Sequence, residues 1–358
     1  MKVLFLAPHL STGGMPAFLL KRIEALLGHT DIEVFVAEWR CYSMSYVVHR
    51  QQIQNLVGNN FISFDGKPEL QKGIIEYCYK NKIDLIHIEE IPEGFDTFNP
   101  FPKEIQQELY DKNHPWKIVE TCHNIYFKPE EKKIYNPDGY AFVTPHHLNS
   151  TFKNQPGGKS LIPFPIDPTI QYPSTQKEAL NQGGWITKGE FHIINIGLWT
   201  PGKNQKYAID IAKGLWEKYR WTYIFHFLGN QAPNFKDYWE PLMKDLPPNV
   251  FILGERNDIA KYFKMADAML FTSNFECNPI VLKEAISHNT RIMAHNLPHY
   301  GDEYTPFIEP LTGNVEDDKF ALTHLIHSPI KYKIGDYNNS VKEFASKHVQ
   351  FYKSIINE

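Results

Sequence analysis

Residues 268–285 read AMLFTSNFECNPIVLKEA, a stretch that passes from an apolar run into a helix start. The run AMLFT (268–272) is short and apolar, which is typical of a buried strand. In open parallel sheets, ligands bind beyond the carboxyl ends of the strands, where loops lead into helix N-termini. The stretch therefore indicates an α/β fold, and we expect functional residues directly after strand ends.

The helix start in this stretch has the chemistry of an anion site. Asn278 is a suitable N-cap and Pro279 a suitable first helical residue, so Ile280 and Val281 are expected to present free backbone amides. These amides and the helix dipole favour a phosphate, although the Asn278 side chain could satisfy the same donors.

Two glutamates flank this predicted anion site. Glu284 lies about one turn further along, roughly 5 Å up the helix axis, and Glu276 stands just before the helix. A phosphate between two carboxylates that bind hydroxyls is the pattern of a nucleotide sugar. The alternative is an ordinary helix start with solvated glutamates, because short motifs often match by chance.

A second strand end, NIGLWTPGKN (195–204), presents Lys203 at the end of a turn that begins with Gly197. A lysine there can reach a phosphate as a mobile point charge. An isolated lysine in a turn is more often simply exposed.

The chain as a whole alternates short apolar runs with longer amphipathic stretches, which predicts parallel sheets with crossover helices. We expect an N-terminal Rossmann-like domain over 1–165, a linker and C-terminal Rossmann-like domain over 166–336, and a helix over 337–358 packed on the N-terminal domain. The predicted strands are 2–7, 32–37, 83–88, 117–121 and 141–144, followed by 191–197, 222–229, 249–254 and 268–272.

Composition narrows the functional classes. The 358 residues carry a net charge of −4, so no basic excess indicates a nucleic-acid partner. Apolar runs are far shorter than the roughly 20 residues of a membrane span, and we expect a cytoplasmic protein that is still compatible with peripheral membrane contact. His295 and His299 lie on either side of Pro298 without a zinc motif, and no D-x-D carboxylate pair is present, so we expect no metal.

Over residues 191–295 the chain resembles glycosyltransferase family 4, retaining enzymes with the GT-B fold of two facing Rossmann-like domains with parallel sheets. Glu276 and Glu284 match the E-x₇-E signature of that family, and Lys203 falls on its diphosphate-binding lysine. The resemblance implies that Ile280 and Val281 supply amides to the phosphate. It also implies that Glu284 binds ribose hydroxyls and that Glu276 binds the transferred sugar.

The sequence departs from the family pattern at one functional position. The family usually has an arginine after the glycine that corresponds to Gly197, and here Leu198 follows. Half of the expected cationic clamp is therefore missing. Either another residue supplies the charge, for which Arg256 after the strand end at Gly254 is the candidate, or donor binding is weakened.

The first half carries two further matches. HLSTGGMPAFL (9–19) resembles the glycine-rich first loop of the family, in which Gly13 and Gly14 let the backbone approach a ligand. His123 follows a predicted strand and matches the histidine near the reacting sugar, where it could donate to a sugar hydroxyl. The simpler interpretations are an ordinary turn and a structural histidine.

The sequence thus favours a retaining, metal-independent glycosyltransferase that needs no cofactor beyond its nucleoside-diphosphate sugar. The acceptor would be a glycan, a lipid-linked glycan or a protein. One alternative, motivated by Leu198, is a GT-B-like protein that binds a nucleotide sugar or glycan without turnover. A nucleotide-sugar epimerase on the same fold is the other.

Overall fold

The structure is a computed structural model that describes residues 1–11, 13–40, 48–65, 67–94, 101–165, 191–256, 258–299, 304–330 and 340–357. The chain divides into two compact units. The first comprises Met1–Pro165 with Asn339–Glu358, and the second comprises Ile166–Asn338. Residues 166–190 of the predicted linker lie outside the described part.

The first unit contains a seven-stranded sheet in the order β3-β2-β1-β4-β5-β6-β7, in which every pairing is parallel. The strand order reverses between β1 and β4, so the carboxyl ends of these two strands form a switch point, where ligands bind in open α/β sheets. The strands are β1 (Lys2–Ala7), β2 (Glu33–Glu38), β3 (Phe61–Ser63), β4 (Leu85–Glu89), β5 (Lys117–Thr121), β6 (Gly139–Phe142) and β7 (Gly158–Leu161).

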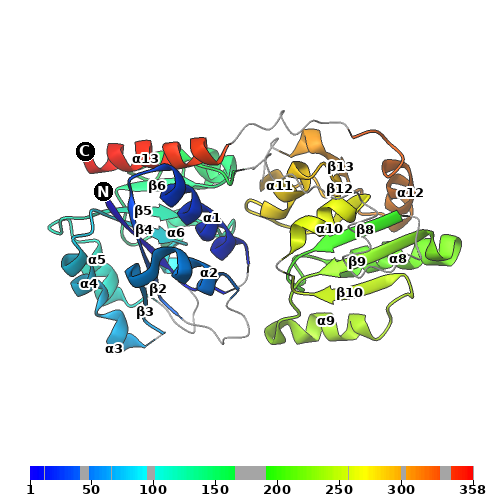
Figure 1. Ribbon diagram of the computed structural model, residues 1–358, viewed down its shortest axis with the longest axis horizontal. Coiled ribbons are helices and arrows are strands. Elements are labelled where there is room, and N and C mark those ends of the chain that lie inside the picture. Colours follow the sequence, from blue (N-terminus) through cyan, green and yellow to red (C-terminus); the bar gives the residue numbers. More distant parts are fainter. Residues whose placement is uncertain are drawn as a thin grey trace. The chain divides into compact units, whose positions relative to one another are not determined.

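Both faces of this sheet are covered, as the apolar strands require. Leu4 and Leu6 pack in the core with residues of α4 and α5, while α1 and α13 run side by side (Figure 1). The helices of the unit are α1 (Gly14–His29), α2 (Val48–Val57), α3 (Pro68–Gln71), α4 (Ile74–Asn81), α5 (Lys103–Leu109), α6 (Pro129–Lys132) and α13 (Val341–Asn357).

The C-terminal helix α13 fits against β6 and β7 because glycines leave room for it. A Cβ atom added at Gly139 would lie 2.7 Å from Ile355 Cδ1 and 2.9 Å from Phe351 Cζ. One added at Gly158 would lie 2.6 Å from the same Ile355 atom. The chain end is therefore part of the N-terminal unit.

The second unit contains a six-stranded parallel sheet in the order β10-β9-β8-β11-β12-β13. Here the order reverses between β8 and β11. The strands are β8 (Phe191–Ile196), β9 (Tyr223–Leu228), β10 (Val250–Gly254), β11 (Ala268–Phe271), β12 (Arg291–Ala294) and β13 (Ile308–Pro310). The helices are α8 (Gln205–Tyr219), α9 (Lys236–Met243), α10 (Ile259–Met265), α11 (Ile280–Ser287) and α12 (Val315–Leu325).

In β8 and β11, alternate residues pack into two different hydrophobic cores. Ile194 and Met269 pack with α10 and α11, whereas Ile193 and Leu270 pack with α8 and α12. The prediction of two α/β domains with parallel sheets is confirmed. Among the described residues, no helix has the length and apolar character that crossing a membrane requires.

A buried histidine pair in this sheet should make the second unit sensitive to acid. His192 Nδ1 and His226 Nε2 are 3.0 Å apart, and both side chains are almost fully buried. Burial lowers the pKa of His226 from 6.5 to about 2. Between these two pKa values, His226 is protonated in the unfolded chain and neutral in the folded one. The free energy of unfolding therefore falls as the pH drops below about 6.5.

We expect His226→Gln to flatten this dependence, since glutamine can still hydrogen bond to His192 but does not titrate. As the pH falls below 6.5, each histidine that stays neutral in the folded state lowers the free energy of unfolding by about 1.4 kcal/mol per pH unit. Between pH 6.5 and 5 this amounts to about 2 kcal/mol. Urea unfolding at several pH values measures the slope. Equal slopes for the variant and the wild type would show that His226 is protonated in the folded protein.

Candidate functional site

The switch point of the second sheet brings two of the predicted loops together. Lys203 lies in the loop after β8 and Glu276 in the loop after β11, and these strands are neighbours. The loops are joined by hydrogen bonds. Thr272 Oγ1 donates to the Lys203 carbonyl oxygen at 3.0 Å, and the Asn274 amide donates to the Gly202 carbonyl oxygen at 2.9 Å. Hydrogen bonds from the Thr272 side chain and the Asn274 backbone thus hold the Lys203 loop in place.

The Lys203 ammonium forms an ion pair with the Glu276 carboxylate. The same ammonium lies 5.6 Å from the centre of the Phe271 ring, within the range of a cation–π contact. The side chain of Lys203 is 31% exposed and that of Glu276 12% exposed, so solvent reaches both groups. An anionic ligand could therefore reach the lysine.

Helix α11 begins one residue later than the sequence suggested. Pro279 takes the cap position in an extended conformation, with φ of −73° and ψ of 99°, and Ile280 is the first helical residue. Asn278 does not cap the helix, because its Oδ1 atom accepts a hydrogen bond from the Tyr304 hydroxyl at 3.2 Å. Within the described part of the chain, no acceptor is found for the amides of Ile280 and Val281.

The observed start of α11 favours an anion site more than the predicted one does. The predicted competitor for the two amides was the Asn278 side chain, and Tyr304 holds it elsewhere. Glu284 lies one turn into α11, and its side chain is partly exposed. The structure brings Lys203, Glu276 and the start of α11 onto the carboxyl ends of two adjacent strands.

The structure does not place Arg256 as a replacement for the missing clamp arginine. Its guanidinium makes two hydrogen bonds of 3.0 Å to the Asp258 carboxylate and lies 5.4 Å from the centre of the Tyr262 ring. Leu198 stands at the expected arginine position, and its carbonyl oxygen accepts a 2.9 Å hydrogen bond from Gln205 Nε2. In this structure Lys203 is the predicted cation that faces Glu276.

Gly197 and Gly229 allow the loops after β8 and β9 to pass close together. The Gly197 amide donates to the Leu228 carbonyl oxygen at 2.9 Å. Gly229 has φ of +147°, and a Cβ atom there would lie 1.9 Å from the Gly197 carbonyl oxygen. The contact holds the first residue of the Lys203 loop against the neighbouring strand.

In the first unit, the predicted glycines lie where α1 begins. Gly13 precedes the helix with φ of +123°, and Gly14 is its first residue. A Cβ atom added at either glycine would have no neighbour within 4 Å, so there is open space beside the backbone. Thr12, between Ser11 and Gly13, lies outside the described residues.

His123 follows β5, and its ring nitrogen Nε2 lies 3.0 Å from Glu89 Oε2 at the end of β4. The other oxygen of Glu89 binds Arg22 of α1, and neither side chain of that ion pair is exposed. Arg22 also lies 3.3 Å from His87 Nε2, and His87 Nδ1 lies 2.6 Å from the Tyr352 hydroxyl of α13.

Neither Arg22 nor Glu89 is among the functional residues that the sequence predicts. The available signal was Glu89 within the otherwise apolar strand IDLIHIEE, because a carboxylate seldom occupies a central strand without a buried partner. The partner could not be identified, since Arg22 lies 67 residues earlier on a different element.

Glu90, the next residue, was also missed. It has φ of +81°, a region that residues other than glycine seldom adopt. Its carboxylate accepts the Ile91 amide at 3.0 Å, and burial raises its pKa to about 7. A strained residue with a perturbed carboxyl group at a strand end is a functional candidate.

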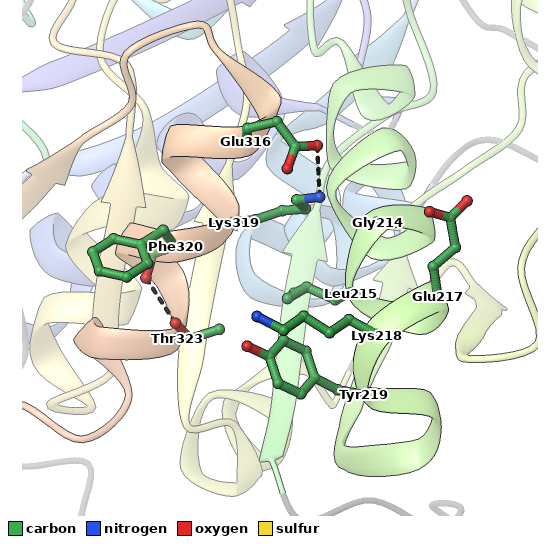
Figure 2. A pocket seen from close by; sticks show the side chains of 9 residues that line it. All are labelled: Gly214, Leu215, Glu217, Lys218, Tyr219, Glu316, Lys319, Phe320 and Thr323. Carbon is green, nitrogen blue, oxygen red and sulfur yellow. Dashed lines mark hydrogen bonds and ion pairs between the residues drawn. The ribbon is translucent and has the colours of Figure 1, made fainter.

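Two hollows lined by described residues lie away from these residues. One of about 440 Å³ lies between α8 and α12, where Glu316 and Lys319 form an ion pair at 2.6 Å (Figure 2). Another, of about 460 Å³, is lined by Tyr126, Ser150, Thr151, Asn154 and Gln155 among others. Neither contains a predicted donor residue, and the mixed charges of the first do not select an anion.

One of the acidic side chains at the start of α12 is buried, which its local sequence does not indicate. The run from Glu316 to Asp318 has the composition of a solvated helix start, and Asn314 does cap the first turn of α12. Asp318, however, is fully buried and accepts hydrogen bonds from the amide and hydroxyl of Thr312 at 2.9 and 2.8 Å. In the described ranges, no group of three or more His, Cys, Asp or Glu side chains is arranged to hold a metal ion.

Comparisons with solved structures relate this architecture to known proteins. HepE of Anabaena, in complex with UDP and glucose, aligns with a TM-score of 0.73 at 15% identity and covers 100% of this chain and 98% of its own. A glycosyltransferase of Rickettsia africae aligns with a TM-score of 0.69 at 15% identity, covering 99% of both chains. The fold is GT-B. At these identities the GT-B structures establish the architecture alone.

Sequence comparisons add two partial matches, of which the first lies in the second unit. Residues 176–327, less than half of the chain, match the family model "Glycosyl transferases group 1". The capsular polysaccharide biosynthesis glycosyltransferase CapH of Staphylococcus aureus is 27% identical over 112 residues, 31% of this chain. The match spans about a third of that relative, 32% of its length. The sequence matches thus concern part of the chain, whereas the solved structures that share its fold cover nearly all of it.

Proposed function

We propose that the protein is a retaining glycosyltransferase that moves a sugar from a nucleoside-diphosphate sugar to an acceptor hydroxyl, without a metal ion. The observation that carries the proposal is the meeting of Lys203, Glu276 and the start of α11 at the switch point of the second sheet. A cation and two amides for which the described residues provide no acceptor form a site for a diphosphate.

The proposed mechanism depends on stabilising the leaving group. Breaking the sugar–phosphate bond builds negative charge on the β-phosphate, which Lys203 and the amides of Ile280 and Val281 would stabilise more than the ground state. The acceptor attacks from the same face, and the departing phosphate takes its proton. Without donor, Lys203 is neutralised by Glu276. We infer that the phosphate replaces this partner and releases Glu276 to bind sugar hydroxyls.

The comparisons guide the choice of donor and acceptor. The HepE structures contain UDP with glucose or UDP-glucose, and CapH is named for capsular polysaccharide biosynthesis. We therefore propose a UDP-sugar as the first donor to test and a glycan, free or lipid-linked, as the first acceptor, with a protein acceptor next. We propose a cytoplasmic location, where nucleotide sugars are available.

The test is a thermal-shift panel of UDP-, GDP- and ADP-sugars, followed by transfer assays with the donor that binds. A donor at 100 times its dissociation constant should stabilise the protein by about 2.7 kcal/mol. We expect Lys203→Ala and Glu284→Ala each to lower kcat/KM at least about tenfold, or ~1.4 kcal/mol. Transfer in the presence of a chelator tests metal independence, and the anomeric configuration of the product tests retention.

Lys206→Ala is the matched control for Lys203→Ala. Lys206 lies in the first turn of α8 and pairs with Asp210 at 2.6 Å on the exposed surface. It should bind donor and transfer sugar as the wild type does. If Lys203→Ala also kept the wild-type rate, the diphosphate site would have to be abandoned.

A binding protein without turnover is the second candidate, and a specific observation favours it. Leu198 replaces the clamp arginine, and Arg256 is held by Asp258. Calorimetric binding of a nucleotide sugar, with neither transfer nor hydrolysis of the donor across a set of acceptors, would support this candidate. Interconversion of the donor alone would instead indicate an epimerase.

A further inference from the structure

His123 in the first unit is held by a buried acid. Its ring nitrogen Nε2 lies 3.0 Å from Glu89 Oε2, while the other carboxylate oxygen of Glu89 binds the Arg22 guanidinium. The side chains of Arg22 and Glu89 have no exposed surface, and that of His123 is 14% exposed. Only the histidine of this row therefore reaches solvent.

The charges of Arg22 and Glu89 determine which ring nitrogen of His123 carries the proton. An arginine is protonated throughout the physiological range, so Glu89 beside it is a carboxylate, which only accepts hydrogen bonds. The ring nitrogen that faces Glu89 must therefore be the one with hydrogen. In a neutral imidazole the other nitrogen, Nδ1, is then an acceptor.

The ring is also kept neutral. Burial and the nearby charge of Arg22 lower the pKa of His123 to about 3. Within the described ranges Nε2 has a hydrogen-bond partner and none is found for Nδ1, and the side chain is 14% exposed. A ring with so low a pKa can accept a hydrogen bond but is a poor base at neutral pH.

We propose that Glu89 and Arg22 are positioning residues that hold His123 with its proton on Nε2, so that Nδ1 accepts a hydrogen bond from a hydroxyl group of the sugar substrate. Sequence analysis suggested that His123 donates to a sugar hydroxyl, and the geometry reverses this direction. The ligand is a hydroxyl donor, not a carbonyl or carboxylate oxygen. Only the identification of the hydroxyl with a sugar rests on the proposed function.

The first experiment reads the tautomer directly. Nitrogen-15 NMR of protein labelled at histidine, with His123→Asn to assign the signals, should show His123 neutral with hydrogen on Nε2 from pH 5 to 8. The charged or titratable groups near the ring are Arg22, Glu89, His147 and Glu90. An imidazolium signal, or hydrogen on Nδ1, in the wild type would overturn the proposal.

Glu89→Gln tests the positioning role. The glutamine amide can either donate or accept, so the constraint on the tautomer is removed and a second set of His123 signals should appear. Glu33→Gln is the matched control, because Glu33 is 50% exposed and pairs with Lys2 on the surface. An unchanged His123 spectrum in a folded Glu89→Gln variant would show that Glu89 does not fix the tautomer.

Two variants of His123 test the contact with substrate. The Asn oxygen can stand near the position of Nδ1, whereas Gln extends toward Glu89 and leaves that position empty. With the donor that the thermal-shift panel identifies, we expect His123→Gln to lose about tenfold in kcat/KM, the size of one hydrogen bond, and His123→Asn to lose less. Equal rates for both variants and the wild type would overturn the proposed hydrogen bond between His123 and the substrate. If no nucleotide sugar binds, the proposed function fails, while the NMR result still decides the tautomer.

Discussion

Arg22→Met is expected to lower the free energy of unfolding of the N-terminal unit by about 3–5 kcal/mol, because it leaves the buried Glu89 carboxylate without its counterion. Neither side chain of this pair has exposed surface. Arg22 also lies 3.4 Å from Thr121 Oγ1 and 4.6 Å from the centre of the Phe18 ring, so several contacts are lost together. Urea unfolding, monitored with a probe in the first unit, measures the change.

A double variant separates charge from packing. Replacing both partners, as in Arg22→Met with Glu89→Leu, removes the unpaired charge, and we expect most of the lost stability to return. Lys21→Met is the control for a surface ion pair. Lys21 pairs with Glu24 at 2.8 Å on the exposed side of α1, and its loss should cost less than about 1 kcal/mol. A double variant as unstable as Arg22→Met would mean that packing dominates the cost.

The sequence predicts a strand well where a run of apolar residues extends along most of it. Strands with several consecutive apolar residues, such as β1 and β9, were located to within about one residue, because both faces of a parallel sheet are buried. The strands β3, β12 and β13 were not predicted. They have three or four residues each, too few to show a pattern against the neighbouring loops.

The candidate site was predictable only in part, for a related reason. Lys203 and Glu276 each follow a strand, so strand order alone brings them close together. The release of the Asn278 side chain from its helix depends on Tyr304, which lies 26 residues further along. The environment of His123 likewise depends on Arg22 of α1, which no local pattern connects with it. Contacts of this kind follow from packing between elements.

Gly229→Ala is expected to have the other large effect. A Cβ atom there would lie 1.9 Å from the carbonyl oxygen of Gly197, and its φ of +147° is a conformation that side chains disfavour. Backbone strain and overpacking each cost about 1–3 kcal/mol, so we expect the second unit to lose about 2–6 kcal/mol. Because Gly197 begins the loop that carries Lys203, donor binding should fall as well. Urea unfolding and the thermal-shift response to the donor measure the two effects.

Gly254→Ala is the matched control, since it separates the two costs. Gly254 also has a positive φ, +69°, and its carbonyl oxygen accepts the Gly229 amide at 2.8 Å, but a Cβ atom there would meet nothing within 4 Å. It should therefore show only the backbone cost of about 1–2 kcal/mol. The difference between the two variants is the cost of the close approach between Gly229 and Gly197. If both variants lose the same stability, that approach relaxes without cost, and the loop of Lys203 is less firmly held than its hydrogen bonds indicate.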